Sequence, residues 1–209
     1  MRPPSEVPSE PTVTQPPSDT HPVEAALDAF VTRYLAAYPD LDDVYDPQWR
    51  SPCETGAPFP GDDGELRVPW QPLRRHGPVD DFAGLERALE MPVHDDIRRF
   101  YARYWSGGLE AEAPEGHVSL LLLWNGEDVD RLIENLIGHA LVKRRARSPF
   151  TVFFACTEPD SELFLSVDND TGAVLLEEPG RPPLREVAPG LAAFLATLEP
   201  AAPQHHPER

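Results

Sequence analysis

The chain has 209 residues, 40% of them apolar, so one domain of ordinary size can bury a hydrophobic core. Its 36 acidic and 18 basic side chains give a formal net charge of -18 at pH 7. This negative charge disfavours binding to nucleic acid, because phosphates need clustered Lys and Arg. It also disfavours direct docking on an anionic membrane, because such a surface attracts basic segments. A basic protein surface suits it as a partner, although an acidic composition also serves solubility alone.

The N-terminal sequence has no apolar core of a signal peptide, and the longest apolar run, 120–124, is too short to span a bilayer. The two cysteines, Cys53 and Cys156, make neither a disulfide framework nor a metal-ligand cluster. We therefore expect a cytoplasmic protein with reduced thiols, no cofactor and no bound metal. Cys156 is expected to pack as a small apolar residue, and Cys53 is the candidate for an exposed thiol.

The chain begins with a segment that is poor in apolar side chains. Residues 1–22 contain seven prolines together with Ser, Thr and Glu. Such a segment cannot bury enough surface to offset the entropy of ordering it. We therefore expect 1–22 to be a disordered, Pro-rich tail, 23–199 to be the folded domain, and 200–209 to be a second disordered tail.

The first helix is predicted from Val23 to Tyr38, where apolar residues recur with the helical period and Pro39 ends the pattern. Residues 39–66 are rich in Asp, Pro and Gly, which predicts a long irregular segment. Two further helices are expected, a short one that follows Asp81 and another from Val93 to Trp105.

The middle of the chain predicts β-strands. Residues 109–113 alternate apolar and acidic side chains, as an edge strand or half-exposed strand does. The largely apolar runs 118–124 and 151–156 predict strands at the centre of a sheet, covered on both faces.

Two short runs, 162–167 and 173–177, flank the sequence Asp-Asn-Asp-Thr-Gly and predict a hairpin that carries Glu177 and Glu178. A final helix is expected over 187–198. Strands in the middle with helices at both ends favour an α+β fold: a single domain with a mixed, mostly antiparallel sheet and helices packed on it.

The longest predicted helix covers 126–146, with Asn125 as its N-cap, acidic residues in its first turns and basic residues at its end. This layout suits the helix dipole, which explains the basic residues better than a nucleic-acid or lipid patch does. His139 flanks the apolar stripe and is expected to hydrogen-bond a backbone group rather than act as a general base. Gly138 predicts the close approach of another element.

Acidic side chains gather in two places along the irregular segment. They are Asp40, Asp42, Asp43 and Asp46, and then Asp62, Asp63 and Glu65. Their spacing does not match a calcium-binding loop, so each cluster is interpreted as solvated surface, and together they are a candidate for one acidic face. Trp70, between Pro69 and Pro72, is equally consistent with a core side chain and with an exposed anchor for a partner.

Four short motifs occur in a fixed order along the chain. They are Ser51-Pro52-Cys53, Trp70-Gln71-Pro72, Glu86-Arg87-Ala88 and Glu134-Asn135-Leu136-Ile137-Gly138-His139. Together they resemble the Syd family of bacterial cytoplasmic proteins, which interact with the SecY translocation channel, over about Val23 to Pro200. The resemblance implies an α+β fold related to the Smi/Knr-like superfamily of yeast cell-wall regulators and bacterial immunity proteins.

The resemblance also implies a non-enzymatic protein, peripheral to the cytoplasmic face of the inner membrane, that binds the basic cytosolic loops of SecY through an acidic concave face and checks translocon assembly. Local charge and proximity to the motifs give the candidate contact residues: Asp42, Asp43, Asp62, Asp63 and Glu65, with Trp70 as an anchor and Glu86 as a flanking acid. The Pro-rich N-terminal extension and the insertion-like segment 59–64 depart from the family pattern.

Two alternatives stay open. An immunity protein that neutralises a basic toxin would use an acidic face equally well. A hydrolase would use Cys53 as nucleophile and His139 as base, although no third residue of a triad is visible and Cys53 lacks a helix-start setting that would lower its thiol pKa.

Overall fold

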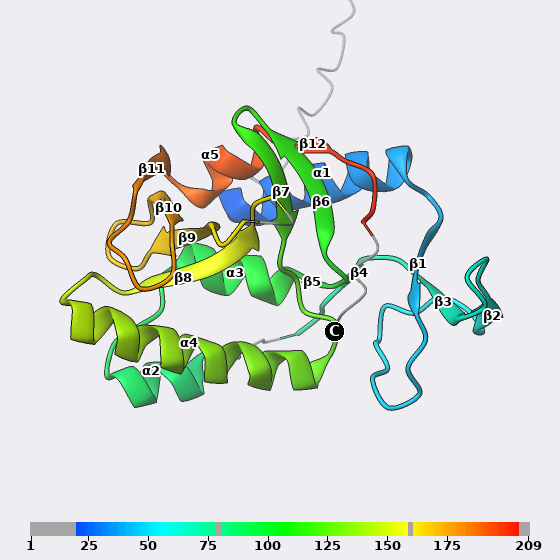
Figure 1. The fold of residues 1–209 in the computed structure, drawn as a ribbon, viewed down its shortest axis with the longest axis horizontal. Coiled ribbons are helices and arrows are strands. Elements are labelled where there is room, and N and C mark those ends of the chain that lie inside the picture. The colour runs from blue at the N-terminus through cyan, green and yellow to red at the C-terminus, as the bar shows by residue number, and fades with distance from the viewer. Residues whose placement is uncertain (1–19, 78–80, 159–160, 205–209) are drawn as a thin grey trace, which may run out of the picture.

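A curled sheet of seven strands forms the centre of the computed structural model, which describes residues 20–77, 81–158 and 161–204 (Figure 1). The strands are β6 (Leu109–Ala113), β7 (Gly116–Leu120), β8 (Thr151–Cys156), β9 (Phe164–Asp168), β10 (Val174–Glu177), β11 (Arg185–Ala188) and β12 (Glu199–Pro200). Their order is β11-β10-β9-β8-β7-β6-β12, and all neighbours pair antiparallel. The predicted α+β domain with a mostly antiparallel sheet is confirmed.

Five helices accompany this sheet in the described part of the chain. They are α1 (Pro22–Ala37), α2 (Ala83–Leu89), α3 (Asp95–Arg103), α4 (Gly126–Ala146) and α5 (Leu191–Leu195). The first, third and fifth pack on one another, and α2 packs on α4. No helix of the described residues is long and apolar enough to cross a membrane.

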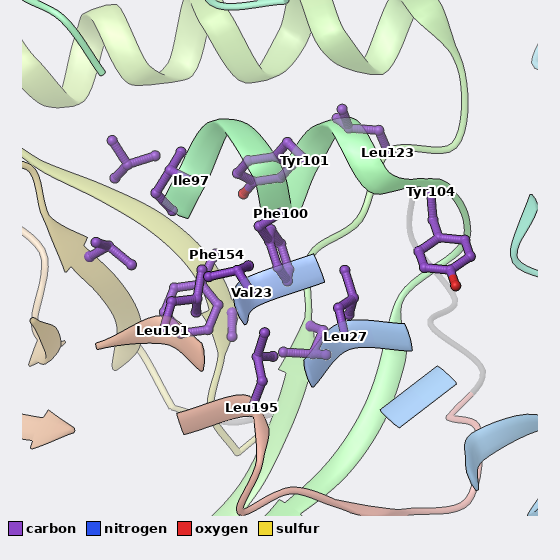
Figure 2. Close-up of a cluster of buried hydrophobic side chains, with 14 of the residues drawn as sticks. Val23, Leu27, Ile97, Phe100, Tyr101, Tyr104, Leu123, Phe154, Leu191 and Leu195 are labelled. Carbon is purple, nitrogen blue, oxygen red and sulfur yellow. The ribbon is translucent and has the colours of Figure 1, made fainter. Parts of the chain in front are cut away.

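The hydrophobic core lies between β8 and the group formed by α1, α3 and α5. Figure 2 shows Val23 of α1, Phe100 of α3, Leu191 of α5 and Phe154 of β8 meeting there, and all four are 0% exposed. Neighbouring residues of a strand point to opposite faces, and Phe153 accordingly lies against α4, where its ring packs edge-on to His139. The sheet is therefore covered by helices on both faces at β8, as its apolar sequence predicted.

Helix α4 agrees with its prediction at both ends, because its start and stop signals are local. The side chain of Asn125 accepts hydrogen bonds from the amides of Glu127 and Asp128, at 2.9 and 3.0 Å. Arg147 ends the helix in the left-handed conformation, with φ 54°. Gly138 is exposed, and no atom of another element lies within 4 Å of the position that a Cβ would take there, so the predicted close contact is wrong.

Near the end of α4, Lys143 is buried rather than displayed with the other basic residues. Its ammonium contacts the carboxylate of Glu177 in β10, whose side chain is 0% exposed and also accepts a hydrogen bond from Ser166 Oγ at 2.5 Å. The interpretation of this end of α4 by the helix dipole alone was incomplete, and Glu177 is a core residue rather than a surface acid.

The C-terminal boundary lies later than predicted. Glu199 and Pro200 of β12 pair with β6, and the amide of Ala201 donates to the carbonyl of Glu110 at 3.0 Å. This short strand covers the edge of β6, so β6 is not an edge strand and Glu110 is only 2% exposed. Residues 205–209 lie outside the described part of the chain.

At the N-terminus, helix α1 starts slightly before the predicted boundary. His21 caps it by accepting a hydrogen bond from the amide of Val23 at 3.4 Å, and its other ring nitrogen lies 3.4 Å from Asp95. His21 and Pro22 thus belong to the folded domain, whereas residues 1–19 lie outside the described residues.

We expect deletion of residues 1–19 to leave the thermal midpoint unchanged within about 1 °C, because this segment has no apolar face to contribute to the core. Deletion of residues 1–22 removes the His21 cap as well and should cost about 1 kcal/mol. Differential scanning calorimetry of both truncations measures this, and a large loss on the shorter deletion would show that the tail packs on the domain.

The segment predicted to be irregular contains a second, small sheet, which Figure 1 shows at the end of the molecule away from β11. Its strands are β1 (Leu41–Val44), β2 (Phe59–Pro60) and β3 (Leu66–Trp70), in the order β1-β3-β2. A third sheet pairs β4 (Leu73–Arg74) with β5 (Tyr104–Trp105), so α3 ends before Tyr104. The helix predicted over 187–198 is also shorter, because residues 185–188 form β11.

Candidate protein-binding surface

The small sheet brings the two acidic clusters together. Asp42 and Asp43 lie on β1, and the hairpin loop between β2 and β3 carries Asp62, Asp63 and Glu65. Both β1 and β2 pair with β3, which places the two clusters on one small body. We call the small sheet and its hairpin loop (41–44 and 59–70) the acidic sheet.

One arginine organises these carboxylates. Arg67 of β3 donates to Asp42 at 2.9 Å and to Asp63 at 2.7 Å, and its side chain is 11% exposed. The hydrogen bond from Arg67 lowers the pKa of the Asp63 carboxyl below its ordinary value. Gly61 allows this arrangement, because a Cβ at that position would lie 2.8 Å from Arg67 Cδ. Asp62, Asp63 and Glu65 remain exposed to solvent, and Asp42 and Asp43 are half-buried.

Trp70 is part of the core rather than an exposed anchor. It is 5% exposed and packs edge-on against Trp124, with ring centroids 5.7 Å apart. It projects from the inner face of the acidic sheet, together with the buried Leu41 and Val68. Of the two interpretations that the sequence left open, the structure shows the core side chain.

The motif residues around Trp70 hold the acidic sheet against the main domain. Ser51 Oγ donates to the carbonyl of Trp124, and the side chain of Asn125 donates to the carbonyl of Arg50 at 3.0 Å. The amide of Gln71 donates to the carbonyl of Cys53 at 3.0 Å. Two of the four motifs therefore meet at the start of α4, where they fix the orientation of the acidic sheet.

Glu86 also has a structural role, because it links α2 to α3. Its carboxylate accepts a hydrogen bond from the amide of Val93 at 2.8 Å and an ion pair from Arg98 at 2.9 Å. These bonds tie α2 to α3, and Figure 1 shows α2 far from the acidic sheet. Glu86 therefore does not flank the acidic sheet, because its closeness to a motif in sequence does not bring it near that sheet in space.

The cysteines have the opposite exposures to those predicted. Cys53 is 1% exposed and lies 3.0 Å from Ser51 Oγ, whereas Cys156, the last residue of β8, is exposed. Ser51 contacts Trp124 at the start of α4, and His139 lies about 20 Å further along that helix at 1.5 Å per residue. Cys53 and His139 therefore do not form the nucleophile–base pair that a hydrolase would need.

A cleft of about 440 Å³ opens between β6–β8 and the start of α4. Its charged lining consists of the acids Glu110, Asp128 and Glu158 and the basic residues His117 and Arg131. His117 Nε2 lies 2.7 Å from Glu110, and although burial alone would lower the pKa of His117, its bonds to Glu110 and Glu112 raise that pKa. Glu110 of this cleft is thus paired within the domain, as Asp42 and Asp63 are in the acidic sheet.

His139 is a packing residue with a side-chain partner. Its Nε2 shares a hydrogen bond of 2.9 Å with Thr151 Oγ1, and the rings of Phe150, Phe153 and Phe164 surround it. Its position at the edge of the buried stripe agrees with the prediction, but its partner is a hydroxyl rather than a backbone group. Burial lowers the pKa of His139, and the nearby Lys143 lowers it further.

We expect His139→Gln to cost about 1–3 kcal/mol of stability, because it removes a buried hydrogen bond and its aromatic contacts. A histidine whose pKa is lowered in the folded state takes up protons more readily when unfolded, so it destabilises the fold as the pH drops below about 6.5. The variant should lose this part of the acid sensitivity, which urea unfolding at about pH 7.5 and about pH 5.5 measures.

His117→Gln is the matched control, because the pKa of His117 is raised and its contribution to stability is lost as the pH rises. The two variants should change the pH dependence in opposite directions. An unchanged stability of His139→Gln together with a loss of partner binding would contradict the packing role.

Fold and surface together define an acidic α+β domain with a charged small sheet at one end. A sequence model described as Syd protein (SUKH-2) matches residues 24–200. Protein Syd of Pseudoalteromonas atlantica is 40% identical over 185 residues, which cover 87% of this chain and 97% of the relative. Protein Syd of Alteromonas mediterranea is 40% identical over 182 residues, covering 85% and 96%, and that of Shewanella denitrificans is 37% identical over 180 residues, covering 84% and 81%.

The chain therefore belongs to the Syd family, as the four ordered motifs predicted.

Proposed function

We propose that this protein binds the basic cytosolic loops of SecY through the acidic sheet, without catalysing a reaction, and that it acts in translocon assembly or quality control. Family membership supports the partner. The observation that supports the surface is that one small sheet carries five carboxylates, two of them paired with Arg67 and three of them exposed. They are Asp42, Asp43, Asp62, Asp63 and Glu65.

The electrostatics of the acidic sheet suit a basic loop. Arg67 is already shared between Asp42 and Asp63, so Asp62 and Glu65 are the carboxylates that a partner's Lys or Arg can approach most directly. Charges on the rim of an interface act mainly on the association rate, and salt screens them over about 8 Å at physiological ionic strength. Binding should accordingly weaken as the salt concentration rises.

The same charge governs how the protein would reach a membrane. With 36 acidic against 18 basic side chains it is repelled by anionic lipid headgroups. We propose that a protein partner recruits it to the cytoplasmic face of the inner membrane, from a cytoplasmic pool, without direct lipid binding or nucleic-acid binding.

A pull-down from detergent-solubilised inner membranes tests the partner. The immobilised protein should enrich SecY over other abundant membrane proteins at low salt and release it at high salt. Recovery of SecY no higher than on an equally acidic unrelated protein would remove SecY as the partner.

The acidic sheet would also fit a basic toxin, so an immunity protein remains the second candidate. The observation that allows it is the same group of exposed carboxylates. A toxin gene beside the gene for this chain, and inhibition of that toxin by the purified protein, would favour the immunity function over SecY binding.

A further inference from the structure

The outer face of the acidic sheet carries exposed apolar side chains as well as carboxylates. Val44 is 47% exposed and Phe59 is 38% exposed. Both are direct cross-strand partners of Arg67 in the sheet register. Directly opposed residues of antiparallel strands project to the same face, so Val44 and Phe59 flank Arg67 on the side turned away from the core.

The two faces of the acidic sheet differ sharply in burial. Leu41 and Val68 on the inner face are 4% and 1% exposed. Asp42 lies two residues before Val44 and therefore shares its outer face, where it accepts the hydrogen bond from Arg67. The inner face thus belongs to the core, and the outer face combines apolar side chains with charge.

Two exposed apolar side chains lie next to one another on this face. Seven large apolar side chains are exposed in the described part of the chain, and Val44 and Phe59 are two of them. Leu66 is also exposed, but it precedes Arg67 in β3 and so points to the opposite face. A single exposed apolar side chain needs no explanation, whereas two that flank one arginine are a candidate surface for protein contact.

The layout of charge on this face defines what can cover it. Arg67 offsets one of the two negative charges of Asp42 and Asp63, so the middle of the face combines apolar side chains with a small net negative charge. Uncompensated acid lies at the hairpin loop, with Asp62 and Glu65. An apolar centre with a charged rim is the usual anatomy of a protein interface, and a purely basic segment would leave Val44 and Phe59 in water.

We propose that the acidic sheet binds a protein segment that carries large apolar side chains among its basic ones. The apolar side chains cover Val44 and Phe59, and the basic ones pair with Asp62 and Glu65. This inference rests on the proposed function, since it specifies the chemistry of the segment that the same surface binds.

Two short synthetic peptides of equal charge test the inference without SecY. In one, Lys alternates with Leu, and in the other, Lys alternates with Ser. The native protein should bind the Lys–Leu peptide about tenfold more tightly in a fluorescence anisotropy titration, which corresponds to partial burial of two apolar side chains. Val44→Ser/Phe59→Ser should remove this preference, whereas Leu184→Ser, at an equally exposed position before β11, should keep it.

Thermal unfolding establishes that the variants are folded. If the double variant is unstable, Val44→Thr keeps the side-chain shape and should reduce the preference for the Lys–Leu peptide in part. Equal affinity of the native protein for the two peptides would overturn the inference, and so would a preference that survives in the Val44→Ser/Phe59→Ser protein.

Failure of this inference can be distinguished from failure of the proposed function. If the native protein prefers the Lys–Leu peptide through Val44 and Phe59 but does not bind SecY, the surface stands and its partner is another protein. If it binds SecY but shows no preference between the peptides, the proposed function stands and this inference fails.

Discussion

Replacing Lys143 with Met is expected to lower the free energy of unfolding by about 3–5 kcal/mol, the largest stability effect that the structure predicts. The substitution leaves the carboxylate of Glu177 in the core without its ammonium partner. Glu177 is 0% exposed, and Ser166 supplies only one neutral hydrogen bond to it. An uncompensated buried charge costs several kcal/mol because the core cannot replace its hydration.

Urea unfolding followed by far-ultraviolet circular dichroism measures this effect. Arg144→Met is the matched control, because Arg144 is the next residue of α4 and is exposed, and it should change stability by less than about 0.5 kcal/mol. Adding Glu177→Gln to Lys143→Met should recover part of the loss, since the neutral amide needs no counter-charge. Equal effects of Lys143→Met and Arg144→Met would contradict the buried ion pair.

The second large effect concerns binding. Reversing two exposed acids of the hairpin loop, Asp62→Lys/Glu65→Lys, should weaken binding to SecY by about tenfold at low salt, equivalent to about 1.4 kcal/mol. Both residues lie outside the ion pairs of Arg67, so the acidic sheet should keep its structure. The loss should come mainly from slower association and should shrink as salt screens the charges.

The control must change the net charge equally at another place. Asp170→Lys/Glu186→Lys does so at two exposed positions, in the turn after β9 and on β11, which Figure 1 shows at the opposite end from the acidic sheet. Surface plasmon resonance gives both rate constants. If the two double reversals weakened binding equally, only the overall charge would matter and the acidic sheet would lose its special role.

The sequence predicted the elements whose signals are local. Helix α4 has a long apolar stripe and the Asn125 cap, and strand β8 is an apolar run between polar residues, so both were located at their observed bounds. The small sheet was missed because its pattern is short and mixed. Residues 41–44 read Leu-Asp-Asp-Val, and only pairing with residues 67–70 makes them a strand.

The candidate site was predictable in part for the same reason. The two acidic clusters lie close in sequence. The pairing of β1 and β2 with β3 then places both clusters on one small sheet. The exposure of Trp70 and the position of Glu86 depend on tertiary packing against Trp124 and Arg98, which no local pattern reveals. Likewise Lys143 looked like a helix-end base because its partner, Glu177, is 34 residues away in the chain.

Co-sedimentation with lipid vesicles that contain reconstituted SecY, beside vesicles of the same lipid without it, tests the central claim most directly. We expect the protein to sediment only with the SecY vesicles, and the bound fraction to fall as salt rises from about 50 to about 500 mM. Asp62→Lys/Glu65→Lys should bind less at low salt, and Asp170→Lys/Glu186→Lys should bind like the native protein. Equal sedimentation with both kinds of vesicle, or binding that neither salt nor the Asp62 and Glu65 reversals change, would contradict recruitment by SecY through the acidic sheet.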